Sequence, residues 1–175
     1  MNLLLFSDNH RDREAVDLIL KANPNCDHYI SLGDSEMREH ELTERNIFGV
    51  KGNYPFEPKF PYDLTFFFEG VKVFLTHGHH YSVKLGLSKL LNKAVYNDIE
   101  IVCFGHTHRA MIKDINGILF INPGALSQNK IFSEPTYAIL DITNQKIQVV
   151  IKSITGEVLE QYQKKRDLNE LRRTI

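Results

Sequence analysis

The sequence NLLLFSDNH, at residues 2–10, indicates the fold class of the chain. It begins as a short apolar run at residues 2–6, which predicts a buried strand, and it ends in polar residues. Apolar residues at helical spacing follow at residues 12–22 and stop before an Asn-Pro pair, which predicts a helix. Two more apolar runs, at residues 29–32 and 47–50, lead into Gly-Asp and Gly-Asn pairs. Alternating strands and helices of this kind predict an α/β fold with parallel strands, whose carboxyl ends collect functional residues.

The second half of the chain predicts a second, more antiparallel set of strands. An Asn-Gly turn between two apolar runs is a strong hairpin signal, and we expect helices outside the sheets. A stripe of apolar residues from Val83 to Val95 predicts a helix, and a charged stretch at residues 36–45 predicts another. The tail from Gly156 is expected to form a solvated helix or a strand and helix. The predicted strands are 65–68, 71–76, 101–104, 111–115, 118–122, 136–142 and 147–154.

Length and charge limit the class of protein. The 175 residues fit one domain, 1–175, with a C-terminal extension at about 156–175. The 21 basic and 22 acidic residues give a net charge of −1, so we expect no stable nucleic-acid partner. We also expect no membrane segment and no signal peptide. Cys26 and Cys103 lie in apolar stretches, so we expect reduced core residues in a cytoplasmic protein.

The eight histidines are not scattered along the chain. Six of them follow predicted strands and two fall elsewhere; the six are His10, His77, His79, His80, His106 and His108. Each short motif has a simpler explanation when it stands alone. Asp8 and Asp34 could cap helices, and the Gly-Asn pair that contains Asn53 could form only a turn. Two separate His-x-His clusters at strand ends are harder to explain as packing, because each buried imidazole needs a partner.

These residue types indicate a metal site of a particular kind. Carboxylate, amide and imidazole ligands together suit Mn²⁺, Fe or Zn²⁺ better than Mg²⁺ or Ca²⁺. The clusters hold no thiolate, which disfavours a structural zinc site. The run His79-His80-Tyr81-Ser82 lacks the Asp and the last His of the metallo-β-lactamase pattern. The chain also contains neither a Gly-x-Ser-x-Gly elbow nor a P-loop.

The motifs, read in order, resemble those of the calcineurin-like metallophosphoesterases. They are Asp8-x-His10, Gly33-Asp34, Gly52-Asn53, His77-Gly-His79 and Gly105-His106-Thr-His108, and they resemble most the small single-domain bacterial and archaeal phosphodiesterases. The resemblance covers residues 2 to about 150 and includes Asn122-Pro123-Gly124. It implies a four-layer α/β/β/α sandwich of two mixed sheets with a dinuclear metal centre.

The resemblance also implies roles for individual residues. Asp8, His10 and His108 would bind one divalent ion, Asn53, His77 and His106 a second, and Asp34 would bridge them. We expect Mn²⁺, with Fe, Zn²⁺ and Ni²⁺ as alternatives. A hydroxide that bridges the two ions would attack phosphorus, and Asp34, Asn53 and His79 are the expected catalytic residues.

One departure from the family pattern concerns the leaving group. Many members carry a histidine directly after the Gly-Asn pair, and this chain has Tyr54 there. His79 is therefore the first candidate for the general acid, because it lies two residues from His77. In an extended segment His80 would point the other way.

These expectations define a function and one alternative. We expect a cytoplasmic metal-dependent phosphoric ester hydrolase, with phosphodiesterase activity ahead of monoesterase activity, acting on a small phosphorylated molecule or nucleotide. The alternative is a slow enzyme or a scaffold that binds protein or phosphate, because the retromer subunit of this superfamily serves as an interaction platform. Loops at 54–62 and 125–134 would line the pocket, so the sequence leaves the substrate open, and it leaves a homo-oligomer open as well.

Overall fold

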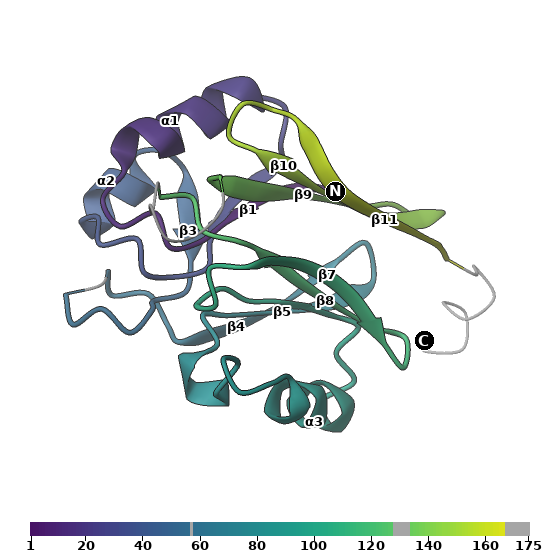
Figure 1. The fold of residues 1–175 in the computed structure, drawn as a ribbon. Coiled ribbons are helices and arrows are strands. Elements are labelled where there is room, and N and C mark those ends of the chain that lie inside the picture. The colour runs from purple at the N-terminus through teal and green to yellow at the C-terminus, as the bar shows by residue number, and fades with distance from the viewer. Residues whose placement is uncertain (57, 128–133, 167–175) are drawn as a thin grey trace.

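Two mixed β-sheets pack face to face and carry helices on both outer faces (Figure 1). This computed structural model describes residues 1–56, 58–127 and 134–166. Sheet A has the order β11-β10-β9-β1-β2-β3, and sheet B has the order β4-β5-β6-β8-β7. The strands of sheet A are β1 (Asn2–Phe6), β2 (His28–Ser31), β3 (Ile47–Gly49), β9 (Thr136–Ile142), β10 (Lys146–Ser153) and β11 (Val158–Lys165). Those of sheet B are β4 (Asp63–Phe68), β5 (Val71–Thr76), β6 (Ile101–Cys103), β7 (Ala110–Ile115) and β8 (Ile118–Pro123).

Helices complete the outer layers of the sandwich. α1 (Arg13–Ala22) and α2 (Glu39–Thr43) cover sheet A, and α3 (Ser88–Tyr96) covers sheet B, as Figure 1 shows. A short 3₁₀ helix, η1 (His79–Tyr81), follows β5. The predicted four-layer α/β/β/α fold of two mixed sheets is therefore confirmed.

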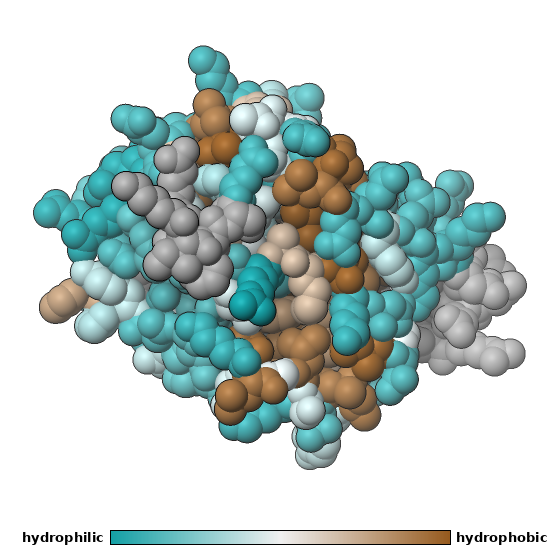
Figure 2. All heavy atoms as spheres, in the orientation of Figure 1, coloured by the Kyte–Doolittle hydropathy of each residue, from teal (hydrophilic) through white to brown (hydrophobic). Residues whose placement is uncertain are grey.

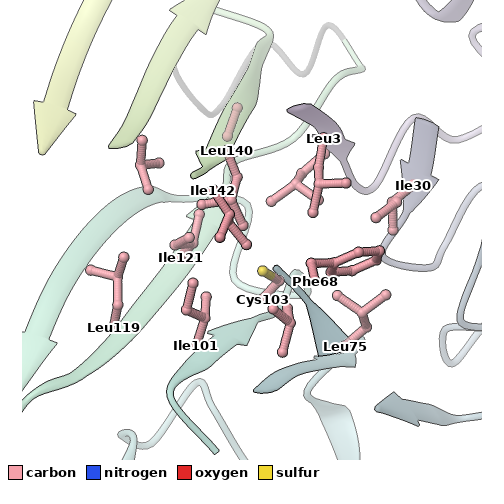
Figure 3. Close-up of a cluster of buried hydrophobic side chains, with 14 of the residues drawn as sticks. Leu3, Ile30, Phe68, Leu75, Ile101, Cys103, Leu119, Ile121, Leu140 and Ile142 are labelled. Atoms are coloured by element: carbon pink, nitrogen blue, oxygen red, sulfur yellow. The ribbon is translucent and has the colours of Figure 1, made fainter. Parts of the chain in front are cut away.

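Alternation along β1 explains why one strand belongs to two cores. Leu3 and Leu5 face sheet B, whereas Leu4 and Phe6 face α1, and all four are fully buried. Figure 3 shows the core between the sheets, where Leu3 of sheet A lies opposite Cys103 of sheet B. Burial on both faces makes the strand continuously apolar, which is why the run at residues 2–6 could be recognised.

Parallel pairing brings the functional loops to one end of the sandwich. In sheet A, β1, β2 and β3 run parallel, so the loops after them share an edge. In sheet B, β5 and β6 are parallel, so the loops after them also share an edge. A hydrogen bond from the His106 N–H to Asp8 Oδ2, 3.1 Å long, joins the two edges directly.

Two helices are shorter than the sequence predicted, and the described part of the tail forms a strand. The stretch 36–45 is helical only at Glu39–Thr43, because Glu36 has a left-handed backbone with φ 56°. The stripe from Val83 begins as a turn, and the helix starts only at Ser88. The tail pairs with β10 as strand β11, and its residues after 166 lie outside the described part.

Both cysteines are free thiols, as predicted. Cys103 is fully buried and Cys26 is half-buried, and burial raises the pKa of both. Among the described residues, no helix combines the length and the apolar character that crossing a bilayer requires.

Candidate metal centre

Two groups of three potential ligands lie at the joined edges of the sheets. Asp8, His10 and His108 form the first, which we call the Asp8 group. Asp34, His77 and His106 form the second, the Asp34 group. Within each group, one ligand atom from each residue lies within 4.8 Å of the others. The structure thus brings together six of the seven residues predicted to bind metal, with Asp34, the expected bridge, beside His77 and His106.

The backbone at these positions is strained. Five of the candidate ligands have left-handed backbone conformations; they are Asp8 (φ 54°), His10 (φ 44°), Asp34 (φ 47°), His106 (φ 67°) and His108 (φ 58°). Such a conformation costs a non-glycine residue about 1–3 kcal/mol and persists where the surroundings impose it. At two of these positions the loops after β1 and β2 hold each other, because the Asp8 N–H donates to the Gly33 carbonyl and the His10 N–H to the Asp34 carbonyl. Strain concentrated on potential ligands is typical of a functional site.

Asp34 is held at one oxygen and left available at the other. Its Oδ1 accepts the N–H groups of Asn53 and Tyr54 at 2.8 and 3.0 Å. Gly52 permits this, because a Cβ there would lie 2.0 Å from Asp34 Oδ1. Burial opposes the charge of Asp34, but His77 and the two N–H groups hold its pKa well below the usual range. Asp34 is therefore a carboxylate, with Oδ2 directed at His77 Nε2, 3.4 Å away.

His77 is fully buried and orientated by the backbone. Its Nδ1 lies 2.7 Å from the Leu32 carbonyl, and an imidazole can meet a carbonyl only as an N–H donor. This leaves Nε2 as the atom for a ligand. Burial disfavours its charge, yet the carboxylates of Asp34 and Asp8 raise its pKa above the usual value. The two groups adjoin at this residue, because Nε2 is also 3.9 Å from Asp8 Oδ1.

The buried atoms of the cluster fit divalent cations. Asp8 Oδ1 lies 3.1 Å from His108 Nε2, and within the described ranges neither Asp8 Oδ1 nor His77 Nε2 has a hydrogen-bond partner. Leaving such atoms unsatisfied costs about 1–3 kcal/mol each. A cation offsets this cost and also the repulsion between the carboxylates of Asp8 and Asp34. The oxygen and nitrogen donors match a divalent ion of intermediate hardness.

Asn53 and His79 stand beside the two groups. The Asn53 side chain is exposed, and its N–H is bound to Asp34. His79 is partly buried, with ring centroids 5.5 Å from His77 and 6.1 Å from His106. A cavity of about 310 Å³ is lined by both residues together with Tyr54 and Tyr62.

His79, beside the two groups, and His106, within the Asp34 group, are kept neutral. Burial, with His80 and His77, lowers the pKa of His79 to about 4. Burial, with His77 and Lys84, lowers the pKa of His106 to about 4 as well. The segment at His79 is helical, so the extended conformation that would turn His80 away from His79 is not present. The rings of His79 and His80 lie 4.0 Å apart.

Sequence reasoning missed Glu36 and named Asn122 only as part of a motif, yet both position the ligands. Glu36 Oε1 lies 2.7 Å from His10 Nδ1, which directs the other ring nitrogen of His10 into the Asp8 group. The buried Asn122 side chain donates to the Gly105 carbonyl and to Thr107 Oγ1, at 2.9 and 3.0 Å. It thereby holds the loop that carries His106 and His108. Glu36 follows Asp34 by two residues, and that spacing was the available signal.

Tyr54 occupies the position where many family members carry a histidine. Its hydroxyl accepts a hydrogen bond from the Arg11 guanidinium at 2.5 Å, and the same guanidinium lies over the tyrosine ring. Arg11 also contacts Glu36, with Nε 3.6 Å from Oε2. The loops around the Asp8 and Asp34 groups are therefore connected by an exposed cation at the mouth of the site.

Comparison with known proteins agrees with this geometry. The family model for the calcineurin-like phosphoesterase superfamily domain matches residues 1–145. The chain belongs to this superfamily. It is 31% identical over 164 residues to a probable metallophosphoesterase of Bacillus subtilis, YsnB, covering 93% of this chain and 97% of that protein. It is also 31% identical over 83 residues to the phosphodiesterase MJ0936 of Methanocaldococcus jannaschii, covering 47% of this chain and 46% of that one.

Solved structures of other proteins show the same fold. A predicted phosphoesterase from Streptococcus pneumoniae superposes with a TM-score of 0.83 at 28% identity, covering 94% of this chain and 97% of the other. Vps29 from Entamoeba histolytica, solved in complex with Zn²⁺, has a TM-score of 0.75 at 18% identity, covering 94% and 99%. The likeness to Vps29 concerns the fold alone.

Proposed function

We propose that this superfamily member is a dinuclear-metal phosphodiesterase that hydrolyses a small phosphorylated molecule or nucleotide. The observation that carries the proposal is the contact between the two ligand groups. His77 Nε2 lies 3.4 Å from Asp34 Oδ2 and 3.9 Å from Asp8 Oδ1, so two ions bound there would be neighbours. We propose Asp34 as the bridging ligand, because its Oδ1 is held by the backbone and its Oδ2 faces the cluster.

Two divalent ions would lower the pKa of a bound water and neutralise the phosphoryl oxygens. Mn²⁺ is our first choice, because the groups combine carboxylates with imidazoles and contain no thiolate. Asn53 would complete the Asp34 group, since its backbone is fixed by the hydrogen bond to Asp34. The exposed Arg11 guanidinium at the mouth of the site would attract the anionic ester.

His79 remains the proposed general acid, with a consequence for substrate choice. At its pKa of about 4, the free imidazole is neutral at pH 7, so it lacks the second ring proton that a general acid would donate. An anionic phosphoester beside it would raise this pKa, because opposite charge favours the protonated ring. Only the fraction of His79 that this effect protonates at pH 7 can act as an acid, so protonation of the leaving group stays inefficient. Esters with good leaving groups should react fastest.

The scaffold alternative has weaker support. Vps29 shares the fold at 18% identity, which does not transfer its interactions to this chain. All the candidate ligands here are Asp, Asn or His, and six of the seven converge, whereas a degraded site would be expected in a scaffold. We also propose a cytoplasmic location, for which the two free cysteines are the support.

The test compares a diester with a monoester on one preparation. We expect the Mn²⁺-loaded protein to hydrolyse bis(p-nitrophenyl) phosphate faster than p-nitrophenyl phosphate. Excess chelator should abolish both rates, and added Mn²⁺ should restore them. If protein with verified metal occupancy hydrolyses neither ester, the scaffold alternative replaces the enzyme.

The leaving group separates the role of His79 from the rest of the site. His79→Ala should lose most of its rate with an alkyl or methyl leaving group and little with p-nitrophenol. His80→Ala, at the exposed neighbour, is the matched control and should change neither rate. Equal losses for both leaving groups in His79→Ala would remove it as the general acid.

A further inference from the structure

A groove of about 980 Å³ runs beside the metal centre between β7 and the start of α3. Figure 2 shows hydrophobic side chains gathered on the face over these elements. The groove is within the range of volumes that hold small organic ligands in proteins. None of the residues above that form the metal ligand groups lines it. The proposed chemistry therefore leaves it without a role.

The groove adjoins the loop that carries two of the candidate metal ligands. Thr107, between His106 and His108 in sequence, lines one end of it. Val83, another lining residue, packs on the turn after His77, because a Cβ added to Gly78 would lie 2.9 Å from Val83 Cγ2. A substrate whose phosphate binds at the two ligand groups would therefore have the groove next to it.

One side of the groove alternates cations with apolar groups. Arg109, Met111 and Lys113 are spaced two residues apart and all line it, as expected for one face of a strand. On this face Met111 packs against Phe104 and against apolar residues of α3. Four residues of extended chain separate the two cations, a distance of about 14 Å.

The opposite side adds a third cation. Lys84 is exposed, lines the groove, and is one of the charges that act on His106. The lining residues are all within the described part of the chain, and none of them is Asp or Glu. A protein with a net charge of −1 therefore presents a groove whose charged lining side chains are all positive.

The floor of the groove suits a flat apolar group. Phe104 is 1% exposed and lies beneath it, with Leu91 and Met111 half-buried beside it. Aromatic and thioether side chains make favourable contacts with rings. The apolar floor and the cationic rim together favour a ligand that carries both a ring and a negative charge.

We propose that this groove binds the part of the substrate beyond the scissile phosphate, and that this part is a nucleoside carrying a second phosphate. The inference rests on the proposed phosphodiesterase function and adds its substrate class. Lys84 and Lys113 are specificity-determining residues in this proposal, since they meet the second phosphate from the two sides of the groove. The ring of the base lies over Phe104 and Met111.

Two chromogenic diesters that differ in one phosphate test the proposal. Thymidine 5′-(p-nitrophenyl phosphate) and its 3′-phosphorylated form have the same leaving group and the same reacting phosphorus. The readout is the ratio of their kcat/KM values, because damage to the metal centre changes both values and cancels. We expect the wild-type protein to prefer the 3′-phosphorylated form through a lower KM, by about fivefold, the upper range for one exposed ion pair.

Charge reversal should remove this preference. Lys84→Glu and Lys113→Glu should each bring the ratio to about one or below it, since repulsion replaces attraction. Lys165→Glu, at an exposed lysine of β11 outside the groove, is the charge-matched control and should retain the wild-type ratio. A wild-type ratio of one overturns the proposal, and so does a ratio that neither groove variant changes.

Failure of the enzyme and failure of the groove can be told apart. If neither diester is hydrolysed, the phosphodiesterase proposal fails, and the groove is tested by calorimetry with Mn²⁺ present. Thymidine 3′,5′-bisphosphate should then bind more tightly than thymidine 5′-monophosphate to the wild type and not to Lys113→Glu. Equal affinities of the two nucleotides for the wild-type protein would overturn the proposal that the groove binds a second phosphate.

Discussion

Replacement of Glu36 by glutamine should weaken metal binding at one ligand group and spare the other. Glu36 Oε1 lies 2.7 Å from His10 Nδ1, and the two side chains are 20% and 32% exposed. A carboxylate at this distance fixes the proton on Nδ1, orientates the ring and makes the other nitrogen a stronger ligand. Glutamine keeps the size of the side chain but loses the charge, so it tests the electrostatic part of the contact.

The magnitude follows from the exposure of the pair. Removal of such a partner costs about 10- to 100-fold in metal affinity. Because both side chains retain some contact with water, we expect the lower value, about tenfold in Kd or about 1.4 kcal/mol. His10 does not belong to the Asp34 group, so the metal affinity of that group should stay within about twofold of the wild-type value.

Calorimetric titration of metal-free protein with Mn²⁺ resolves the two sites. The Glu36→Gln protein should show one weakened site and one site like the wild type. Glu44→Gln, at an exposed glutamate after α2, is the matched control and should titrate like the wild type. Unchanged affinity at both sites, or equal weakening of both, would refute the assigned role of Glu36.

Three further outcomes follow from the structure. Asp34→Asn should lower kcat for bis(p-nitrophenyl) phosphate by about a thousandfold in a steady-state assay, because a neutral amide cannot balance the charge of two cations. The control Asp98→Asn, at an exposed loop aspartate, should keep the wild-type rate, and a fully active Asp34→Asn would exclude Asp34 as the bridging ligand. Asn122→Ala should lower the free energy of unfolding, measured by urea denaturation, by about 3 kcal/mol, because the Gly105 carbonyl and the Gly124 N–H, both buried, lose their hydrogen-bond partner. The control Asn92→Ala, at an exposed asparagine, should change this free energy little, and equal losses in the two variants would contradict the role of Asn122. Glu41→Gln should lower the thermal midpoint at pH 7, because the Arg13 contact and the Arg38 N–H hold the pKa of Glu41 at about 2 in the folded protein. A lowered pKa stabilises the fold above the ordinary pKa of 4.5, so the difference in midpoint between the variant and the wild type should shrink as the pH falls from 4.5 toward 2. A difference in midpoint that does not change with pH would contradict this role of Glu41.

The strands and ligand motifs could be predicted because both depend on short stretches of sequence. The run at Asn2–Phe6 is apolar on both faces, and the polar residues directly after it mark the end of a strand. The same pattern recurs before His77 and His106. Parallel pairing then brings these ends together without any further information about side chains.

Contacts between distant segments could not be predicted in this way. Glu36 meets His10 across 26 residues, and Asn122 meets Gly105 across 17. Both depend on how loops bend after the strands, and left-handed backbone at Asp8 and Asp34 leaves no pattern in residue type. Helical spacing from Val83 also hid the turn that forms one side of the groove.

The most direct test of the two-metal phosphodiesterase is a rate measured against occupancy. Metal-free protein receives Mn²⁺ in steps, and each sample is divided between metal analysis and hydrolysis of bis(p-nitrophenyl) phosphate. The two adjoining ligand groups predict that the rate rises with the second ion bound and levels off at two ions per chain. A rate that stays at background when two ions per chain are bound would contradict the account.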